Sequence, residues 1–179
     1  MGERPRLAVR STQTRASNEP IYHSSVFHIT INSNRKPRTI QQRNQMVETY
    51  SQLIDEQFQD DEFMFDSGFI RVLRPGDNLT QIKTIDTTFA VEQGRKRGRI
   101  HAHVTVEVIH STKIRLDPLI LVNKLEDQLG YRPYVHIQGS SNPTFNLREY
   151  AAKNNLASNL VPRTPANSPL PLRRRLPTK

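Results

Sequence analysis

The sequence predicts an α+β fold: a central antiparallel sheet of about five strands flanked by helices. One observation is that hydrophobic residues recur at every second position in some segments and at helical spacing in others. Another is the segment order, which reads β-α-β-β-β-α-β-α. The three consecutive middle strands are joined by short links, and such links require antiparallel neighbours. Helices packed on one sheet then complete the fold.

Each element follows from a local pattern. Residues 25–32 (SVFHITIN) alternate between apolar and polar side chains, as a half-buried strand does. Asp117 is a natural N-cap and Gly130 a natural stop for a helix between them. Asn146 and Glu149 resemble a capping box that starts a last helix. We expect strands at 25–32, 68–74, 81–92, 99–109 and 132–138, and helices at 38–58, 118–129 and 147–155.

Composition divides the chain into three parts. Residues 1–20 lack periodicity and are expected to be a flexible N-terminal segment, and residues 21–156 form the folded domain. Residues 157–179 form a disordered tail rich in Pro and Arg. The net charge is +9, but the two ends hold most of it, so the folded part is nearly balanced. Charge alone therefore supports only a weak, salt-sensitive attraction to phosphates.

Several classes of protein are excluded by composition. The chain has no Cys, so it has no disulfide, no thiolate zinc site and no cysteine nucleophile. No apolar run approaches about 18 residues, and the N-terminus lacks the apolar stretch of a signal peptide. We therefore expect a protein that is not secreted and has no membrane partner.

The segment 91–108 (VEQGRKRGRIHAHVTVEV) carries the first chemical motif. If it folds as a hairpin that turns at Lys96-Arg97, Glu92 lies opposite His101. His103 is two residues further along, so its side chain lies on the same face of the sheet. One carboxylate and two imidazoles leave open positions on an ion. Such a set suits Mg²⁺ or Mn²⁺ without excluding Zn²⁺, Co²⁺ or Ni²⁺. The alternative is that His-Ala-His occurs by chance, and one bulge would spoil the register.

The second motif is NLREYAAKNN at 146–155. Tyr150 and Lys153 are three residues apart on the expected helix and therefore share a face. A tyrosine phenolate is a competent nucleophile toward phosphorus, and a nearby lysine can stabilise its charge or bind the phosphate. The alternative is a tyrosine packed on the sheet beside a solvated lysine, and this spacing alone favours that alternative.

None of the remaining histidines and tyrosines is assigned a catalytic or metal-binding role. His28 shares a strand face with Thr30, which leaves open whether it lines the site. Tyr50 lies on the apolar stripe of the first helix and is expected in the core. The other side chains lack partners at metal spacing or the helical context of a nucleophile: His23, His110, His136, Tyr22, Tyr131 and Tyr134.

Together these motifs resemble the HUH endonuclease superfamily of rolling-circle replication initiators, transposases and relaxases. FHITIN at 27–32 resembles the family's first motif. Glu92 with His101-Ala102-His103 resembles its metal motif, and Tyr150 with Lys153 its nucleophile helix. The resemblance covers about 22–155 and implies an HUH/Rep-like fold related to the RRM palm. EQGRKRGRIHAH is especially similar to the nuclease domains of transposons of the replitron and Helitron kind. The single Tyr of the motif fits replitrons better.

The resemblance implies a metal-dependent endonuclease that nicks and rejoins single-stranded DNA in rolling-circle replication or transposition. Tyr150 would become joined to the 5′ phosphate, with Lys153 assisting and Glu92, His101 and His103 holding Mg²⁺ or Mn²⁺. A helicase domain or protein is the partner that many relatives use. A eukaryotic transposon or viral origin implies the nucleus, and any other origin the cytoplasm. Four basic residues lie at the expected turn of the hairpin, where they either bind flanking phosphates or are only solvated: Arg95, Lys96, Arg97 and Arg99.

Two alternatives of other classes remain open. One is a non-catalytic nucleic-acid-binding α+β domain, which would stack bases on aromatic residues of the sheet face. The strand HAHVTVEV has no aromatic residue, which argues against it. The other is a metal-dependent hydrolase that uses water in place of Tyr150, and such an enzyme would tolerate the loss of the tyrosine hydroxyl.

Overall fold

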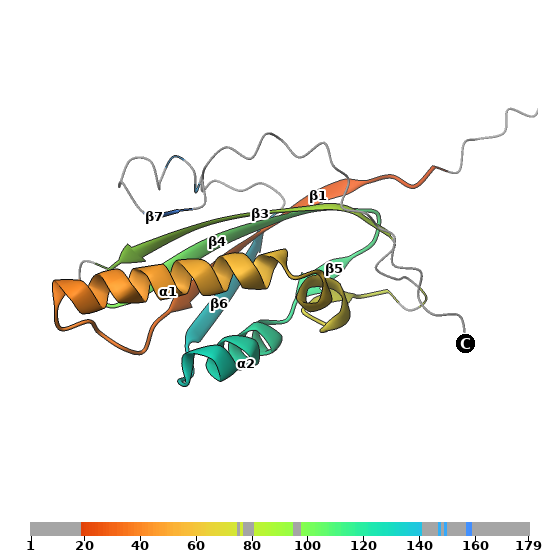
Figure 1. Cartoon of the computed structure of the whole chain (residues 1–179). Coiled ribbons are helices and arrows are strands. Elements are labelled where there is room, and N and C mark those ends of the chain that lie inside the picture. The colour runs from red at the N-terminus through yellow and green to blue at the C-terminus, as the bar shows by residue number, and fades with distance from the viewer. Residues whose placement is uncertain are drawn as a thin grey trace, which may run out of the picture.

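Four long antiparallel strands form the centre of the molecule (Figure 1). The computed structural model describes residues 19–74, 76, 81–94, 98–140, 147, 149, 157 and 158. Across the sheet the strands follow in the order β6 (Tyr134–Ser140), β1 (His23–Asn32), β4 (Ile100–His110), β3 (Ile82–Gln93) and the short edge strand β7 (Ala157–Ser158). The fold is therefore α+β, as the sequence predicts.

Two helices lie on the same face of this sheet, as Figure 1 shows. Helix α1 (Ile40–Gln59) packs on β3 and β4, and helix α2 (Pro118–Leu129) packs on β6. Alternation along the strands matches this arrangement, since Ile29 and Ile31 of β1 are fully buried beneath the helices. Polar side chains of the same strands therefore lie on the opposite face, which we call the open face because neither α1 nor α2 covers it.

Local sequence fixes where each helix begins and ends. The Thr39 hydroxyl accepts a hydrogen bond of 3.1 Å from the backbone N–H of Gln42 and so caps α1. The Asp117 carboxylate does the same for α2, accepting from the N–H of Leu119 at 3.0 Å. Gly130 ends α2 in the left-handed conformation, with φ 70°, which a residue without a side chain adopts freely.

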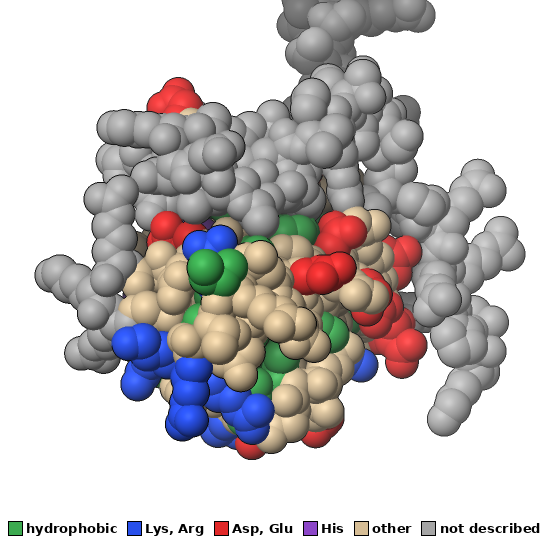
Figure 2. All heavy atoms as spheres, turned by 60° about the vertical axis from the view of Figure 1, so that its left-hand side comes forward, with side chains coloured by type: hydrophobic (Ala, Val, Ile, Leu, Met, Phe, Trp, Pro, Cys, Tyr) green, Lys and Arg blue, Asp and Glu red, His purple; other side chains and the backbone are tan. Residues whose placement is uncertain are grey.

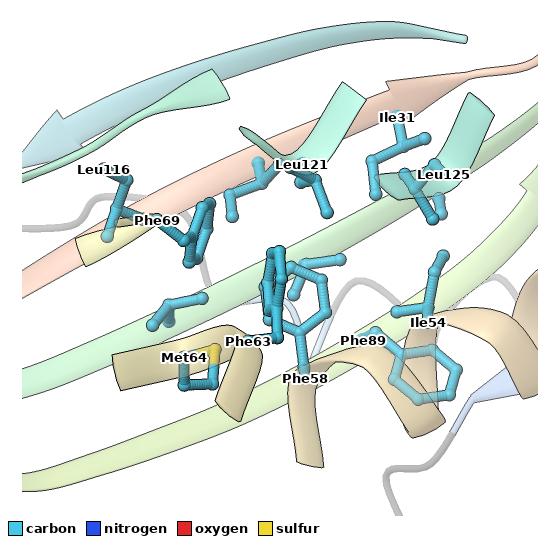
Figure 3. Close-up of a cluster of buried hydrophobic side chains, with 14 of the residues drawn as sticks. Ile31, Ile54, Phe58, Phe63, Met64, Phe69, Phe89, Leu116, Leu121 and Leu125 are labelled. Carbon is cyan, nitrogen blue, oxygen red and sulfur yellow. The ribbon is translucent and has the colours of Figure 1, made fainter. Parts of the chain in front are cut away.

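Three phenylalanine rings pack together within the hydrophobic core (Figure 3). Phe63 and Phe69 stack with their ring centroids 4.8 Å apart, and Phe58 meets both rings edge to face. Phe58 comes from the end of α1, while Phe63 belongs to a π-helical turn, η1 (Glu62–Asp66), that follows it. These rings join the segment after α1 to the sheet, because they bury large apolar areas in offset and edge contacts.

Two sequence-based expectations about the elements were wrong. The segment predicted as a strand at 68–74 is only β2 (Ile70–Val72), and it does not join the main sheet. It pairs instead with β5 (Ile114–Leu116), a strand that was not predicted, in a separate two-stranded sheet. The three middle strands are therefore not one meander.

The C-terminal assignments are tested only in part. Leu147 and Glu149 are helical, as expected for the start of the last helix, and the rest of 147–155 lies outside the described residues. Ala157 and Ser158, which the sequence analysis places in the tail, form β7 and pair with Val91 and Ala90 of β3. The expected flexible segment 1–20, except its last two residues, and the tail from 159 onward also lie outside the described residues.

Truncation of Phe69 in the phenylalanine cluster should strongly destabilise the protein. Phe69 is 0% exposed and contacts two other rings, so Phe69→Ala removes a buried side chain and leaves a cavity. We expect a loss of about 3–5 kcal/mol in the free energy of unfolding, measured by urea denaturation. Leu73→Ala is the control: Leu73 is 47% exposed, and a change within about 0.5 kcal/mol is expected. Equal losses for the two variants would contradict this account of the core.

Candidate functional site

The β3–β4 hairpin has the register that the sequence predicts. Glu92 pairs with His101, and Ala90 pairs with His103. The one irregularity in the ladder lies between Ile82 and Thr84, far from the hairpin end. Because Ala102 is fully buried on the helix side, both histidines lie on the open face together with Glu92.

Glu92 and His103 are in direct contact. The Oε1 atom of Glu92 lies 3.0 Å from Nε2 of His103, and both side chains are mostly buried. A carboxylate only accepts, so in this contact Nε2 of His103 carries the proton and donates it. The contact runs diagonally across the hairpin, since Glu92 stands opposite His101 in the ladder.

The His101 ring is turned toward the hairpin end. A Cβ placed on Gly94 would lie 2.8 Å from Nε2 of His101, so the imidazole occupies the space that a side chain at 94 would need. Burial lowers the pKa of His101; Glu92 opposes this shift, while His103 and Arg99 reinforce it. The ring is therefore held neutral near neutral pH, which is the form that binds a metal.

His28 of β1 extends the cluster on the other side. Its Nε2 lies 3.4 Å from Nδ1 of His103, and the two ring centroids are 5.6 Å apart. Burial lowers the pKa of His28, and the neighbouring His103 and His136 lower it further. A neutral His28 can accept a proton from Nδ1 of His103 or donate one to it. This contact orients His103 as a second-layer partner orients a metal-bound histidine.

Strand pairing explains why these side chains meet. In β6 and β1, His136 lies opposite Thr30, and Thr30 lies opposite His103 of β4. His28 lies two residues before Thr30 in β1 and therefore on the same face. The open face thus carries four histidines. The sequence left the role of His28 open and assigned none to His136. The alternation of polar and apolar residues in a strand indicates which face a side chain is on, but it does not reveal which strand pairs with it.

The spacing of Glu92 and His103 is compatible with two ligands of one divalent ion. Two ligand atoms at right angles on an octahedral ion, each at about 2.1 Å, are about 3.0 Å apart. Glu92 Oε1 and His103 Nε2 have that separation. With the His101 ring turned toward Gly94, no group of three or more potential ligands meets at one point among the described residues. Glu92 and His103 therefore have the spacing of two ligands of one ion, which would replace the proton on Nε2. His101 lies on the same face, directly opposite Glu92.

Five of the predicted site residues lie outside the described residues: Tyr150, Lys153, Arg95, Lys96 and Arg97. Their positions relative to the histidines stay predictions. Arg99 is described, is partly buried just before β4, and is close enough to His101 to influence its pKa.

A basic pocket of about 320 Å³ lies where β1 leads into α1. Its walls include three cations and two amides: Arg35, Lys36, Arg38, Gln42 and Gln45. Figure 2 shows Lys and Arg side chains gathered on this end of the molecule. The pocket adjoins the hairpin, because a Cβ on Gly98 would lie 3.0 Å from Cε of Lys36. The backbone N–H of Ser33 also bonds to the carbonyl of Ile100.

Two other candidate groups have structural roles. Tyr50 is buried, as predicted, and its hydroxyl lies 2.9 Å from that of Tyr131. Burial and this hydrogen bond raise the pKa of Tyr50 far above its usual value, which disfavours the phenolate form that a nucleophile needs. His110 is buried, with Nδ1 bonded to the carbonyl of Thr112 and Nε2 2.7 Å from the hydroxyl of Ser25.

The chain matches none of the family models, curated proteins or solved structures with which it was compared. Among the described residues, no helix is both long and apolar enough to cross a membrane.

Removal of the His28 imidazole should weaken metal binding. Bound through Nε2, His103 must carry its proton on Nδ1, and His28 Nε2 is the acceptor that lies beside it. We expect His28→Ala to lower Mn²⁺ affinity by about 10- to 100-fold in calorimetric titration of the protein alone. His28→Gln keeps an acceptor and should lose less. The control is His23→Ala, an exposed position on the same strand. Wild-type affinity in His28→Ala would contradict the orienting role.

Proposed function

We propose that this protein is an HUH-type endonuclease that nicks and rejoins single-stranded DNA through a tyrosine. The observation that supports it most is the register of the β3–β4 hairpin, which puts Glu92, His101 and His103 on one open face. The 3.0 Å contact between Glu92 and His103 supports it further. A chance His-Ala-His would have no reason to face a carboxylate in register.

In this proposal Glu92, His101 and His103 hold Mg²⁺ or Mn²⁺. Glu92 and His103 already have a suitable separation, and His101 joins them when its ring turns away from Gly94. When bound, the ion polarises the scissile phosphate and stabilises the negative charge that develops there. His28 holds the proton of His103 on the side away from the ion.

The chemical step is a transesterification. The Tyr150 hydroxyl attacks phosphorus, a bond forms between its oxygen and the 5′ phosphate, and the bond from phosphorus to the 3′ oxygen breaks. The tyrosine proton passes to solvent and the 3′ oxygen takes one up, so no water is consumed. Lys153 stabilises charge on the phenolate or phosphate. Attack of the 3′ hydroxyl on the phosphotyrosine reverses the step and rejoins the strand.

The surroundings of the hairpin suit a polyanionic substrate. The basic pocket with Arg35, Lys36 and Arg38 adjoins it, and Arg99 lies beside His101. We propose that Arg95, Lys96 and Arg97 of the turn bind further phosphates. The reaction serves rolling-circle replication or transposition, with a helicase opening the duplex. It takes place in the nucleus for a eukaryotic transposon or virus, and in the cytoplasm otherwise.

Loss of both imidazoles should abolish metal-dependent nicking. His101→Ala with His103→Ala removes two of the three proposed ligands from a strand face where alanine leaves no core cavity. We expect no cleavage of a labelled single-stranded oligonucleotide with Mn²⁺ on a denaturing gel, and an unchanged thermal melting profile. The matched control is Thr105→Ala with Glu107→Ala, further along the same strand and face. Wild-type nicking by the histidine double variant would reject the metal site.

Loss of one hydroxyl should abolish the covalent product. Tyr150→Phe keeps the ring but removes the attacking oxygen, so the heat- and detergent-resistant protein–DNA band should disappear while DNA binding remains. Lys153→Ala should slow band formation by about 100-fold without preventing it. Cleavage by Tyr150→Phe without an adduct would indicate water as the nucleophile. Peptide mapping of the adduct to another tyrosine would also refute the assignment.

A further inference from the structure

Tyr134 is an exposed aromatic side chain on the open face. The residue is 60% exposed, although it is the first residue of a strand in the main sheet. Val135 and Ile137 of β6 pack against the core, so Tyr134 and His136 lie on the opposite face. The face that carries the histidines therefore also carries an aromatic ring, contributed by a strand far from them in the sequence.

The sheet register places Tyr134 in line with the proposed metal ligands. Tyr134 pairs with Asn32, Asn32 pairs with His101, and His101 pairs with Glu92. These four residues form one row across the sheet. Two strand spacings separate the backbones of Tyr134 and His101, which is about 10 Å. A single nucleic-acid strand along this row can therefore contact the ring and the metal ligands together.

Positive charge lies beside the Tyr134 end of the row. The Asn34 amide donates a hydrogen bond to the carbonyl of Arg132, which joins the loop after β1 to the segment before β6. In that loop the Arg35 guanidinium lies over the Tyr131 ring, 4.5 Å from its centroid, and Arg35 also lines the basic pocket. Arg35 therefore lies at the same end of the sheet as Tyr134, on the side that carries α1. A base on Tyr134 and phosphates that reach this end of the sheet fit such an arrangement.

We propose that Tyr134 is a base-stacking residue that selects single-stranded over duplex nucleic acid. One base of the strand stacks on the ring, and phosphates further along the strand reach the cations at this end of the sheet. Cations alone attract duplex and single strand alike, whereas an exposed ring needs a base that is free to leave its neighbours. This inference rests on the proposed function for its substrate, single-stranded DNA, and gives Tyr134 a positioning role rather than a chemical one.

Binding measurements separate stacking from charge. Fluorescence anisotropy with a labelled oligonucleotide in EDTA reports binding without cleavage. We expect Tyr134→Ala to weaken single-strand binding by about 5- to 100-fold, and Tyr134→Phe to bind like the wild type. Duplex affinity and the salt dependence of binding should not change, because no phosphate contact is lost. The control is Tyr22→Ala, which removes an exposed tyrosine that precedes β1.

A fluorescent variant tests the contact directly. The chain contains no Trp, so Tyr134→Trp introduces a single reporter. Its emission should be quenched by a single-stranded oligonucleotide and much less by an abasic strand of the same length. Equal quenching by both strands, or equal loss of duplex and single-strand affinity in Tyr134→Ala, would overturn the proposal.

The two proposals fail in different ways. A wild-type protein that binds single strands through Tyr134 but never nicks them with Mn²⁺ would refute the nuclease and leave the stacking role intact. A protein that nicks, with Tyr134→Ala binding as the wild type does, would refute stacking alone. A wild-type protein that shows no affinity for single strands would refute both.

Discussion

The pairing of β3 with β4 is the constraint on which the candidate site depends. A slip of one residue would turn His101 and His103 toward the helices and bring Ala102 and Val104 to the open face. Ala102 and Val104 are fully buried, so such a slip would remove apolar area from the core and bury two imidazoles in its place. Packing of the hydrophobic face of the hairpin against the helices therefore fixes the register, and the register places His101 and His103 on the opposite face.

The central strand β1 joins the site to the rest of the sheet. It lies between β4 and β6, with Ile29 and Ile31 beneath the helices and His28 and Asn32 on the open face. His28 contacts His103 of β4. Asn32 pairs with His101 of β4 on one edge of β1 and with Tyr134 of β6 on the other edge. Because both edges of β1 are paired, its side chains are held on a rigid element rather than on a loop. A site that must orient an imidazole benefits from such rigidity.

Local sequence patterns correctly predicted the features that depend on residues close together in the sequence. The register of Glu92 with His101 follows from a short hairpin, and the limits of α2 follow from Asp117 and Gly130. Contacts between distant segments could not be predicted in this way. The assignment of β2 to the main sheet was wrong because its partner β5 is distant in sequence, and three residues give little periodicity. His28 remained undecided for the same reason, since 75 residues separate it from His103.

Gly94 shows how the hairpin end and the site constrain each other. A glycine next to a turn is usually explained by a positive φ, but Gly94 does not have a positive φ. A Cβ at 94 would instead lie 2.8 Å from the His101 ring. The absence of a side chain at Gly94 therefore leaves space in which the imidazole can lie away from Glu92 and His103. If His101 must move between that position and the shared ion, a side chain at 94 would remove one end of the movement. The identity of residue 94 would then be set by the chemistry across the ladder.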